Sequence, residues 1–430
     1  MSATTSATLI LAVMAGAFIV AKLLKISTEL SLLAAALAGA LAAGNGLPAR
    51  AIVEGAFTYF DIVLIFVTAT LFMNLLKESG AAAFVVRAIL RRFHRHKAPL
   101  FVLLALLLLV PGALTGAGSV TVLIMGGMSA TVLATMDIPR PKIAAIIFVI
   151  AGLSAAAPPV NLWAMLTAAG VNMPYVGFFL PLLVPCVLLA MLTIFILGAK
   201  SKPVDLAKAL AELPEAPPKM NWVRVATPFL VFFLLVVAGR VFPFSVPILG
   251  LPLMFAAAAA AALLLSPVRI ALFRTSVDTV HQLMPLIGTL TCAGILVEIM
   301  ALTGVRGLIA ITTVTLPVTI VFLTLAITLP VSEAVLMWGA APVLGVPLVL
   351  LFNTIGLNPV VALAGMSVIW PLGDAIPPTA IIGRLTTSTV GMKESYGKFL
   401  RYCIVPAILI AVVGTLMVVF SKKLAFLTVF

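Results

Sequence analysis

Apolar segments long enough to cross a lipid bilayer recur along nearly the whole chain. A membrane-spanning helix needs about 20 predominantly apolar residues in succession, and this chain of 430 residues is 63% hydrophobic and only 9% charged. The clearest spans are Ser6–Leu24, Leu30–Leu47, Tyr175–Gly198, Trp222–Gly239 and Ile404–Phe420. No soluble domain fits between them. The sequence therefore predicts an all-α polytopic membrane protein, whose apolar surface is covered by lipid.

The positive charge of the chain lies in short loops between the apolar spans. The formal net charge is +13, and the basic residues gather between Arg87 and Lys97 and in the central loop from Lys200 to Arg224. Loops rich in Lys and Arg stay on the cytoplasmic side of a membrane, so we expect both segments inside and the N-terminus outside. The lipid bilayer thus accounts for the charge, and no nucleic-acid partner is expected.

The first interruption follows an apolar segment that is too short to span. Pro99–Ala113 leads to the Gly-rich stretch Thr115–Ser119, and a second apolar run continues to Met136. Basic residues flank both outer ends, which favours the same side of the membrane for both. The pattern predicts a re-entrant hairpin over residues 99–137 with its tip near mid-depth, where protein or a water-filled cavity must cover the irregular backbone.

The next span is interrupted by two consecutive prolines. The apolar run Ile143–Ala157 reaches Pro158 and Pro159 and then resumes at Asn161. Two prolines remove two backbone donors and push the preceding residue out of the helical region. We therefore expect a broken helix over residues 143–170.

The second half repeats this order of interruptions. Residues 307–350 predict a second hairpin with its tip at Pro330–Glu333, and residues 359–390 predict a second broken helix with its elbow at Gly373–Pro378. The same order twice indicates an internal repeat, and the predicted topology makes the two copies inverted, as in many secondary transporters. The predicted units are a first half, residues 1–199, a cytoplasmic linker, residues 200–221, and a second half, residues 222–430.

Broken helices offer binding groups at mid-depth. The free N–H groups at a helix start attract anions, and the free carbonyl groups at a helix end suit Na⁺. A different interpretation is that the hydroxyl groups only cap helices or bond within them. The predicted cation ligands are Thr115, Gly116, Gly118, Ser119, Pro158, Thr328, Ser332, Glu333 and Asp374. The predicted substrate contacts are Ser119, Asn161, Ser332 and Thr379.

Two acidic residues lie at the breaks of the second half. A carboxylate at bilayer depth is unfavourable by roughly 2.5–3.5 kcal/mol on insertion scales. Glu333 and Asp374 could complete a Na⁺ site or carry a coupling H⁺. The alternative is structural: Glu333 would cap a half-helix N-terminus, and Asp374 would pair with a cation or cap the following turn.

Several stretches together resemble a known family. They are Thr68–Gly80, Gly116–Ser119, Pro158–Pro159, the central loop and Gly373–Pro378, and they resemble the large membrane subunit of tripartite ATP-independent periplasmic (TRAP) transporters, within the ion transporter superfamily. The resemblance implies Na⁺-driven uptake of small, C4-dicarboxylate-like organic acids across the bacterial inner membrane by an elevator-type movement. It also implies two partners, a four-helix small membrane subunit and a periplasmic substrate-binding protein.

Other functions fit the same architecture less closely or not at all. Glu333 and Asp374 stand where the family pattern suggests small or neutral residues, so the alternative is a stand-alone H⁺- or Na⁺-coupled organic anion symporter or antiporter of the same superfamily. A channel has no need of inverted double breaks. An enzyme would show clustered catalytic groups, and the spacing of the His, Ser and acidic residues predicts none.

Overall fold

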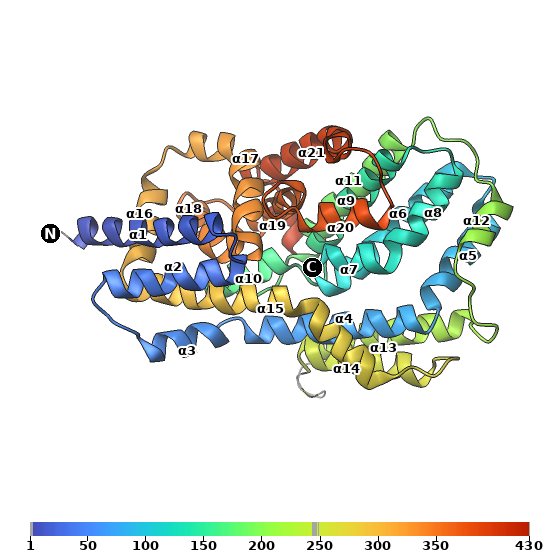
Figure 1. Cartoon of the computed structure of the whole chain (residues 1–430), viewed down its shortest axis with the longest axis horizontal. Helices are drawn as coiled ribbons and strands as arrows, with labels where there is room; N and C mark the ends of the chain where they lie inside the picture. The colour runs from blue at the N-terminus through green and yellow to red at the C-terminus, as the bar shows by residue number, and fades with distance from the viewer. Residues whose placement is uncertain (1–2, 243–246, 248, 430) are drawn as a thin grey trace.

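Every regular element that the structure describes is helical. The structure, a computed structural model, describes residues 3–242, 247 and 249–429 (Figure 1). Within that part, nine helices are long and apolar enough to cross a membrane. The prediction of an all-α polytopic membrane protein is confirmed.

The two halves carry matching series of helices, separated by a short helix in the central loop. The first half contains α1 (Ala3–Leu23), α2 (Thr28–Ala42), α3 (Ala49–Phe57), α4 (Phe60–Glu78), α5 (Ala81–Phe93), α6 (Lys97–Thr115), α7 (Gly118–Thr121), the π-helical turn η1 (Val122–Gly126), α8 (Gly127–Thr135), α9 (Arg140–Ala156), α10 (Leu162–Gly170) and α11 (Phe179–Leu197). The loop contains α12 (Leu206–Glu212).

The second half continues with helices of similar lengths. They are α13 (Trp222–Val241), α14 (Leu251–Leu264), α15 (Leu272–Leu302), α16 (Val305–Thr315), α17 (Val318–Leu336), the 3₁₀ turn η2 (Met337–Gly339), the π-helical turn η3 (Ala341–Gly345), α18 (Val346–Thr354), α19 (Pro359–Ile369), the 3₁₀ segment η4 (Trp370–Ala375), α20 (Ile381–Thr389), α21 (Tyr396–Val419) and the 3₁₀ segment η5 (Ala425–Val429).

A constant spacing relates the two halves. Arg140 begins α9 and Pro359 begins α19, 219 residues later (359 minus 140). Leu162 and Ile381, which begin α10 and α20, are also 219 residues apart (381 minus 162). The same spacing separates η1 from η3, α8 from α18, and the two double-proline elbows. Each half thus contains one hairpin followed by one broken helix.

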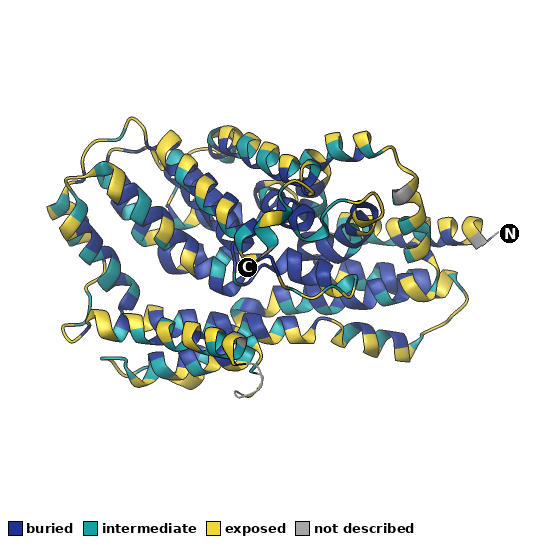
Figure 2. Cartoon of the chain, turned by 180° about the vertical axis from the view of Figure 1, so that it is seen from behind, coloured by how far each residue is buried: buried dark blue, intermediate teal, exposed yellow. Residues whose placement is uncertain are grey.

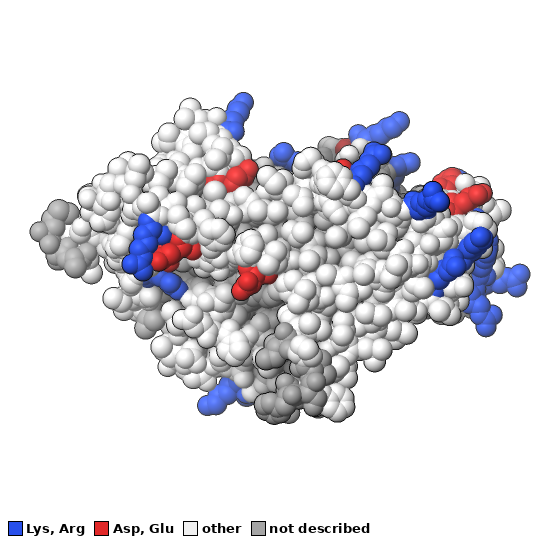
Figure 3. All heavy atoms as spheres, turned by 90° about the horizontal axis from the view of Figure 1, so that it is seen from below, with Lys and Arg blue, Asp and Glu red and all other residues white. Residues whose placement is uncertain are grey.

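The two hairpins open toward opposite ends of the molecule. The Lys97 ammonium at the start of α6 donates to the Ala199 carbonyl (2.7 Å), and the Lys202 N–H donates to the Met136 carbonyl after α8 (2.9 Å). Both ends of the first hairpin therefore meet one segment, on the right in Figure 1 with α12, whereas α16 and α18 lie on the left. The repeats are inverted. Lys and Arg side chains gather most densely at that right-hand end (Figure 3).

The centre of the molecule is filled by the first arms of the two broken helices. Every residue of α9 from Ile143 to Ala156 is buried, as is every residue of α19 from Val361 to Ile369. Helices that are apolar on all sides need protein or lipid around them. Figure 2 shows buried residues concentrated in the middle of the molecule and exposed ones on the outer helices.

The predicted tip of the second hairpin is wrong. Pro330–Glu333 lies inside α17, and the chain turns at Met337–Gly339, where Met337 has a φ of +55°. The predicted first arm is also wrong, because α16 is a separate helix and the arm begins at Val318. Pro330 is a residue of the helix interior and not of a turn. Prolines are tolerated inside membrane helices when neighbouring groups satisfy the freed carbonyl, and Pro111 stands inside α6 at the equivalent place.

Glycines allow α19 and α21 to cross at close range. A methyl group at Gly365 would lie 2.6 Å from the Gly414 carbonyl oxygen and 2.9 Å from the Met417 Cβ atom. Both of these neighbours belong to α21, and one is backbone, which cannot rotate away. The crossing therefore depends on the absence of side chains.

We predict that Gly365→Ala lowers the free energy of unfolding by about 1–3 kcal/mol, the usual effect of overpacking a close contact. Thermal unfolding of the detergent-purified protein would measure this. Gly16→Ala is the matched control, because a methyl group there meets no atom within 4 Å. Equal melting temperatures for the two variants would contradict the prediction.

Candidate functional site

The four interruptions of the two repeats meet in the middle of the molecule. Figure 1 places α7, α10, α19 and α20 near the centre of the long axis. The tip of the first hairpin contacts α20, because a methyl group at Gly118 would lie 2.9 Å from the Ile382 Cδ1 atom. The first arm of the second hairpin contacts α10 through a hydrogen bond from the Trp163 indole to Glu333. Each hairpin thus meets the broken helix of the other half.

Each elbow is also tied to the hairpin of its own half. The Val160 N–H donates to the Ala113 carbonyl of α6 (3.1 Å). The Thr379 hydroxyl donates to the Ala334 carbonyl of α17 (3.0 Å). Both double-proline peptide bonds are cis. These contacts satisfy backbone groups that the interruptions leave free, as buried polar groups require.

Two carboxyl groups lie side by side in the second half. Glu333 is 1% exposed, and its Oε2 atom accepts a hydrogen bond from the Trp163 Nε1 atom (2.9 Å). Asp374, on η4, is 3% exposed. The two segments pack closely, because a methyl group at Gly373, the residue before Asp374, would lie 2.6 Å from the Glu333 Cβ atom. Among the described residues, Glu333 Oε1 and Asp374 Oδ2 have no hydrogen-bond partner.

This arrangement is electrostatically unfavourable when both carboxyl groups are ionised. An unpaired ionised carboxylate is strongly disfavoured in a buried site, and two of them repel each other. No ion pair to Glu333 or Asp374 occurs in residues 3–242, 247 and 249–429. The unpaired form in which both groups are ionised is therefore strongly disfavoured.

Two further predicted residues lie on or against α17 beside Glu333. Ser332 precedes Glu333; its hydroxyl donates to the Leu329 carbonyl (2.7 Å) and accepts from the Trp370 indole (3.3 Å). Thr379 reaches the same helix through Ala334. The structure thus brings together Ser332, Glu333, Asp374 and Thr379. Glu333 caps no helix N-terminus, because it lies near the C-terminal end of α17.

In the first half, the predicted polar side chains form hydrogen bonds with the backbone around the interruptions. The Thr115 hydroxyl donates to the Pro111 carbonyl (2.7 Å) and accepts from the Ala117 N–H (3.4 Å). Gly116 has a φ of +64°, which glycine adopts without steric conflict. The Asn161 amide accepts from Ala164 at the start of α10 (2.8 Å) and donates to the end of α9 (2.7 Å). The Asn161 side chain therefore links the end of α9 to the start of α10 across the elbow.

Four other predicted ligands belong to different parts of the two repeats. Thr328 lies on the exposed face of α17, where its hydroxyl donates to the Thr324 carbonyl of the same helix (3.0 Å). Ser119 is half-buried at the start of α7, and Pro158 is buried at the first elbow. Gly118 lies close to the Ala151 carbonyl, where any Cβ atom would be 2.7 Å from that oxygen. Their roles in ion binding stay predictions.

Sequence reasoning missed two tryptophans that donate to the site. Trp163 follows the first elbow and Trp370 precedes the second, and both side chains are fully buried. A signal was present: the chain has four Trp, and Trp163, Trp338 and Trp370 all stand beside interruptions. An indole N–H inside an apolar segment needs an acceptor.

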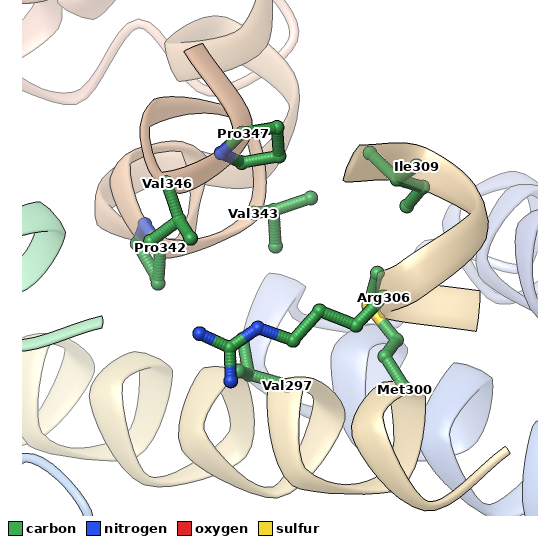
Figure 4. Close-up of a pocket in the computed structure, with 8 residues that line it drawn as sticks. All are labelled: Val297, Met300, Arg306, Ile309, Pro342, Val343, Val346 and Pro347. Carbon is green, nitrogen blue, oxygen red and sulfur yellow. The ribbon is translucent and has the colours of Figure 1, made fainter. Parts of the chain in front are cut away.

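Arginines from the opposite half hold the far ends of α10 and α20. The Arg306 guanidinium donates to the Gly170 carbonyl at the end of α10 (2.5 Å). Figure 4 shows its side chain extending from α16 past Val297. Arg140 of α9 donates to the Val390 carbonyl at the end of α20. Cations at helix C-termini stabilise the helix dipole, so these contacts fix both half-helices after the elbows.

The fold is shared with two solved structures of membrane transporters. The YdaH transporter of Alcanivorax borkumensis, described as having an unusual topology, gives a TM-score of 0.63 at 15% sequence identity, over 88% of this chain and 88% of that chain. MtrF of Neisseria gonorrhoeae, described with a class of antimetabolite efflux pumps, gives a TM-score of 0.60 at 13% identity, over 85% of this chain and 82% of that chain.

These comparisons show the architecture and not the family. No family model and no curated protein matches the sequence. The resemblance to TRAP transporters is therefore not confirmed, whereas a multi-pass membrane protein with a transporter fold is.

Proposed function

We propose that this chain is a secondary active transporter in which a coupling cation, Na⁺ or H⁺, binds between Glu333 and Asp374. The observation that carries the proposal is the pair of adjacent buried carboxyl groups, each with an unpartnered oxygen atom, at interruptions where half-helices of both repeats meet. Transporters of inverted-repeat architecture bind substrate and ions at such interruptions. YdaH and MtrF, which share the fold, are described as a transporter and an efflux pump.

The second elbow supports an organic anion as the transported substrate. α20 begins at Ile381 with no side-chain cap, so N–H groups of its first turn remain available to an anion. The Arg384 guanidinium lies beside them and donates to the Pro378 carbonyl (3.4 Å). Ile376, Pro377 and Pro378 are exposed, which gives a solute access to this end of the site. Small, dicarboxylate-like organic acids fit this chemistry.

The proposed coupling between the cation and the anionic substrate has an electrostatic cause. A cation that neutralises the two carboxyl groups removes the penalty of burying them, and it also lowers the repulsion that a nearby anionic substrate would feel. Binding of the cation therefore favours binding of the anion, and the reverse holds by linkage. We propose no enzymatic step.

Glu333→Gln and Asp374→Asn are each expected to abolish gradient-driven uptake of a C4-dicarboxylate into proteoliposomes, because each removes half of the cation site. An imposed Na⁺ gradient and an imposed H⁺ gradient, applied separately, identify the coupling cation. Asp278→Asn, which changes an exposed acid on α15, is the matched control. Coupled uptake that persists in both site variants would remove the pair from the mechanism.

Arg384→Gln is expected to raise the KM for the dicarboxylate by about tenfold or more, since hydrogen bonds to charged groups contribute about 1.5–3 kcal/mol. Initial uptake rates over a range of substrate concentrations would measure this. Arg274→Gln removes an exposed guanidinium far along the chain and serves as the control. An unchanged KM in Arg384→Gln would exclude the anion site at α20.

The proposal has two forms, which differ in whether the chain needs partner subunits. As the large permease of a TRAP transporter in the bacterial inner membrane, the chain would move by an elevator mechanism and require a small membrane subunit and a periplasmic substrate-binding protein. As a stand-alone symporter or antiporter, it would transport alone. Reconstitution of the chain alone, and with both candidate partners added, distinguishes the two: uptake only with partners supports the tripartite form.

A further inference from the structure

A large cavity lies beside the first elbow, away from the pair of carboxyl groups. Its volume is about 630 Å³, within the range of about 300–1,000 Å³ typical of small-molecule sites. Residues of α4, α5, α6, η1, α11 and α13 line it, together with Pro158 and Pro159 of the elbow. The cavity thus separates helices of the first hairpin from the surrounding helices α4 and α13.

The walls of this cavity suit a hydrocarbon chain. Leu, Val, Ala, Met, Ile, Phe and Pro supply all the lining side chains except Lys77 and Trp222. A small dicarboxylate would find almost no hydrogen-bond donor there, and apolar cavities do not retain water. Within a bilayer, the abundant apolar occupant is a lipid acyl chain, which contacts such walls as it contacts other hydrocarbon.

The two polar lining residues belong to helix ends. Lys77 lies in the last turn of α4, and Trp222 begins α13, where its ring packs edge-on against Phe84 (5.3 Å between centroids). No carboxylate of the described chain forms an ion pair with Lys77. The neighbouring Glu78 carboxylate instead accepts a hydrogen bond from Thr275 (2.8 Å). Lys and Trp in such positions contact lipid headgroups.

We propose that this cavity binds an acyl chain of an anionic membrane phospholipid, with the phosphate at Lys77 and the chain directed toward the Pro158–Pro159 elbow. The Lys77 ammonium matches the phosphate in charge, and the apolar walls match the chain. The lipid fills the space between the first hairpin and helices α4 and α13. It is distinct from the transported anion, whose site is at the second elbow.

Native mass spectrometry of the delipidated, detergent-purified protein tests this, with dioleoylphosphatidylglycerol and dioleoylphosphatidylcholine as probes. We expect one phosphatidylglycerol retained per chain in preference to phosphatidylcholine. Lys77→Gln should weaken its retention about fivefold, the effect of one cation near an anionic headgroup. Ala82→Phe should weaken retention by narrowing the cavity. Lys393→Gln, at an exposed lysine that does not line the cavity, should match the unmodified protein.

Several results would overturn the proposal. One is equal retention of the two lipids by the unmodified protein; another is retention unaffected by Lys77→Gln in a variant with an unchanged melting temperature. Binding of palmitate without binding of phosphatidylglycerol would assign the cavity to a free fatty acid instead. The measurement uses no ion gradient and no transported substrate, so its outcome is independent of the proposed transport function.

Discussion

Backbone groups without helical partners can exist at the depth of a membrane only when protein surrounds them. Each unsatisfied N–H or carbonyl group in hydrocarbon is unfavourable by several kcal/mol. The structure meets this constraint by burying α9 from Ile143 onward and α19 from Val361 onward. It also joins each elbow to a hairpin, through Val160 and Ala113 in one half and Thr379 and Ala334 in the other. Contacts between the halves, such as the hydrogen bond from Trp163 to Glu333, complete this cover.

The two halves repeat the same backbone structure, but their side chains at equivalent positions differ in polarity. At the spacing of 219 residues (333 minus 114, 374 minus 155), Glu333 and Asp374 correspond to Leu114 and Ala155. The first half therefore has an apolar pair where the second half has two carboxyl groups. The first elbow adjoins an apolar cavity, whereas the second elbow is exposed and has an uncapped helix start. These differences support the proposals that the cation and the anionic substrate bind in the second half and that lipid binds in the first.

The buried carboxyl groups also explain why transport would be coupled. Each has an oxygen atom without a partner, and the Trp163 indole donates only to Glu333. A site that needs a cation for electrostatic reasons changes its affinity for anions when the cation leaves. The contacts of Arg306 with α10 and of Arg140 with α20 hold the half-helices around this site, so a movement of one half would be transmitted to the other.

The sequence by itself determined the membrane class, the order of hairpin and broken helix, and the two elbows, because long apolar runs and double prolines have few other structural solutions. The sequence pattern misplaced the tip of the second hairpin, because a proline inside a helix cannot be distinguished from a proline in a turn unless the neighbouring helices are known. Only the tertiary structure decided that Thr328 faces outward, that Asn161 bridges its elbow, and that Trp163 meets Glu333 across 170 residues of chain. Such contacts depend on how the two halves pack, and no local pattern encodes that packing.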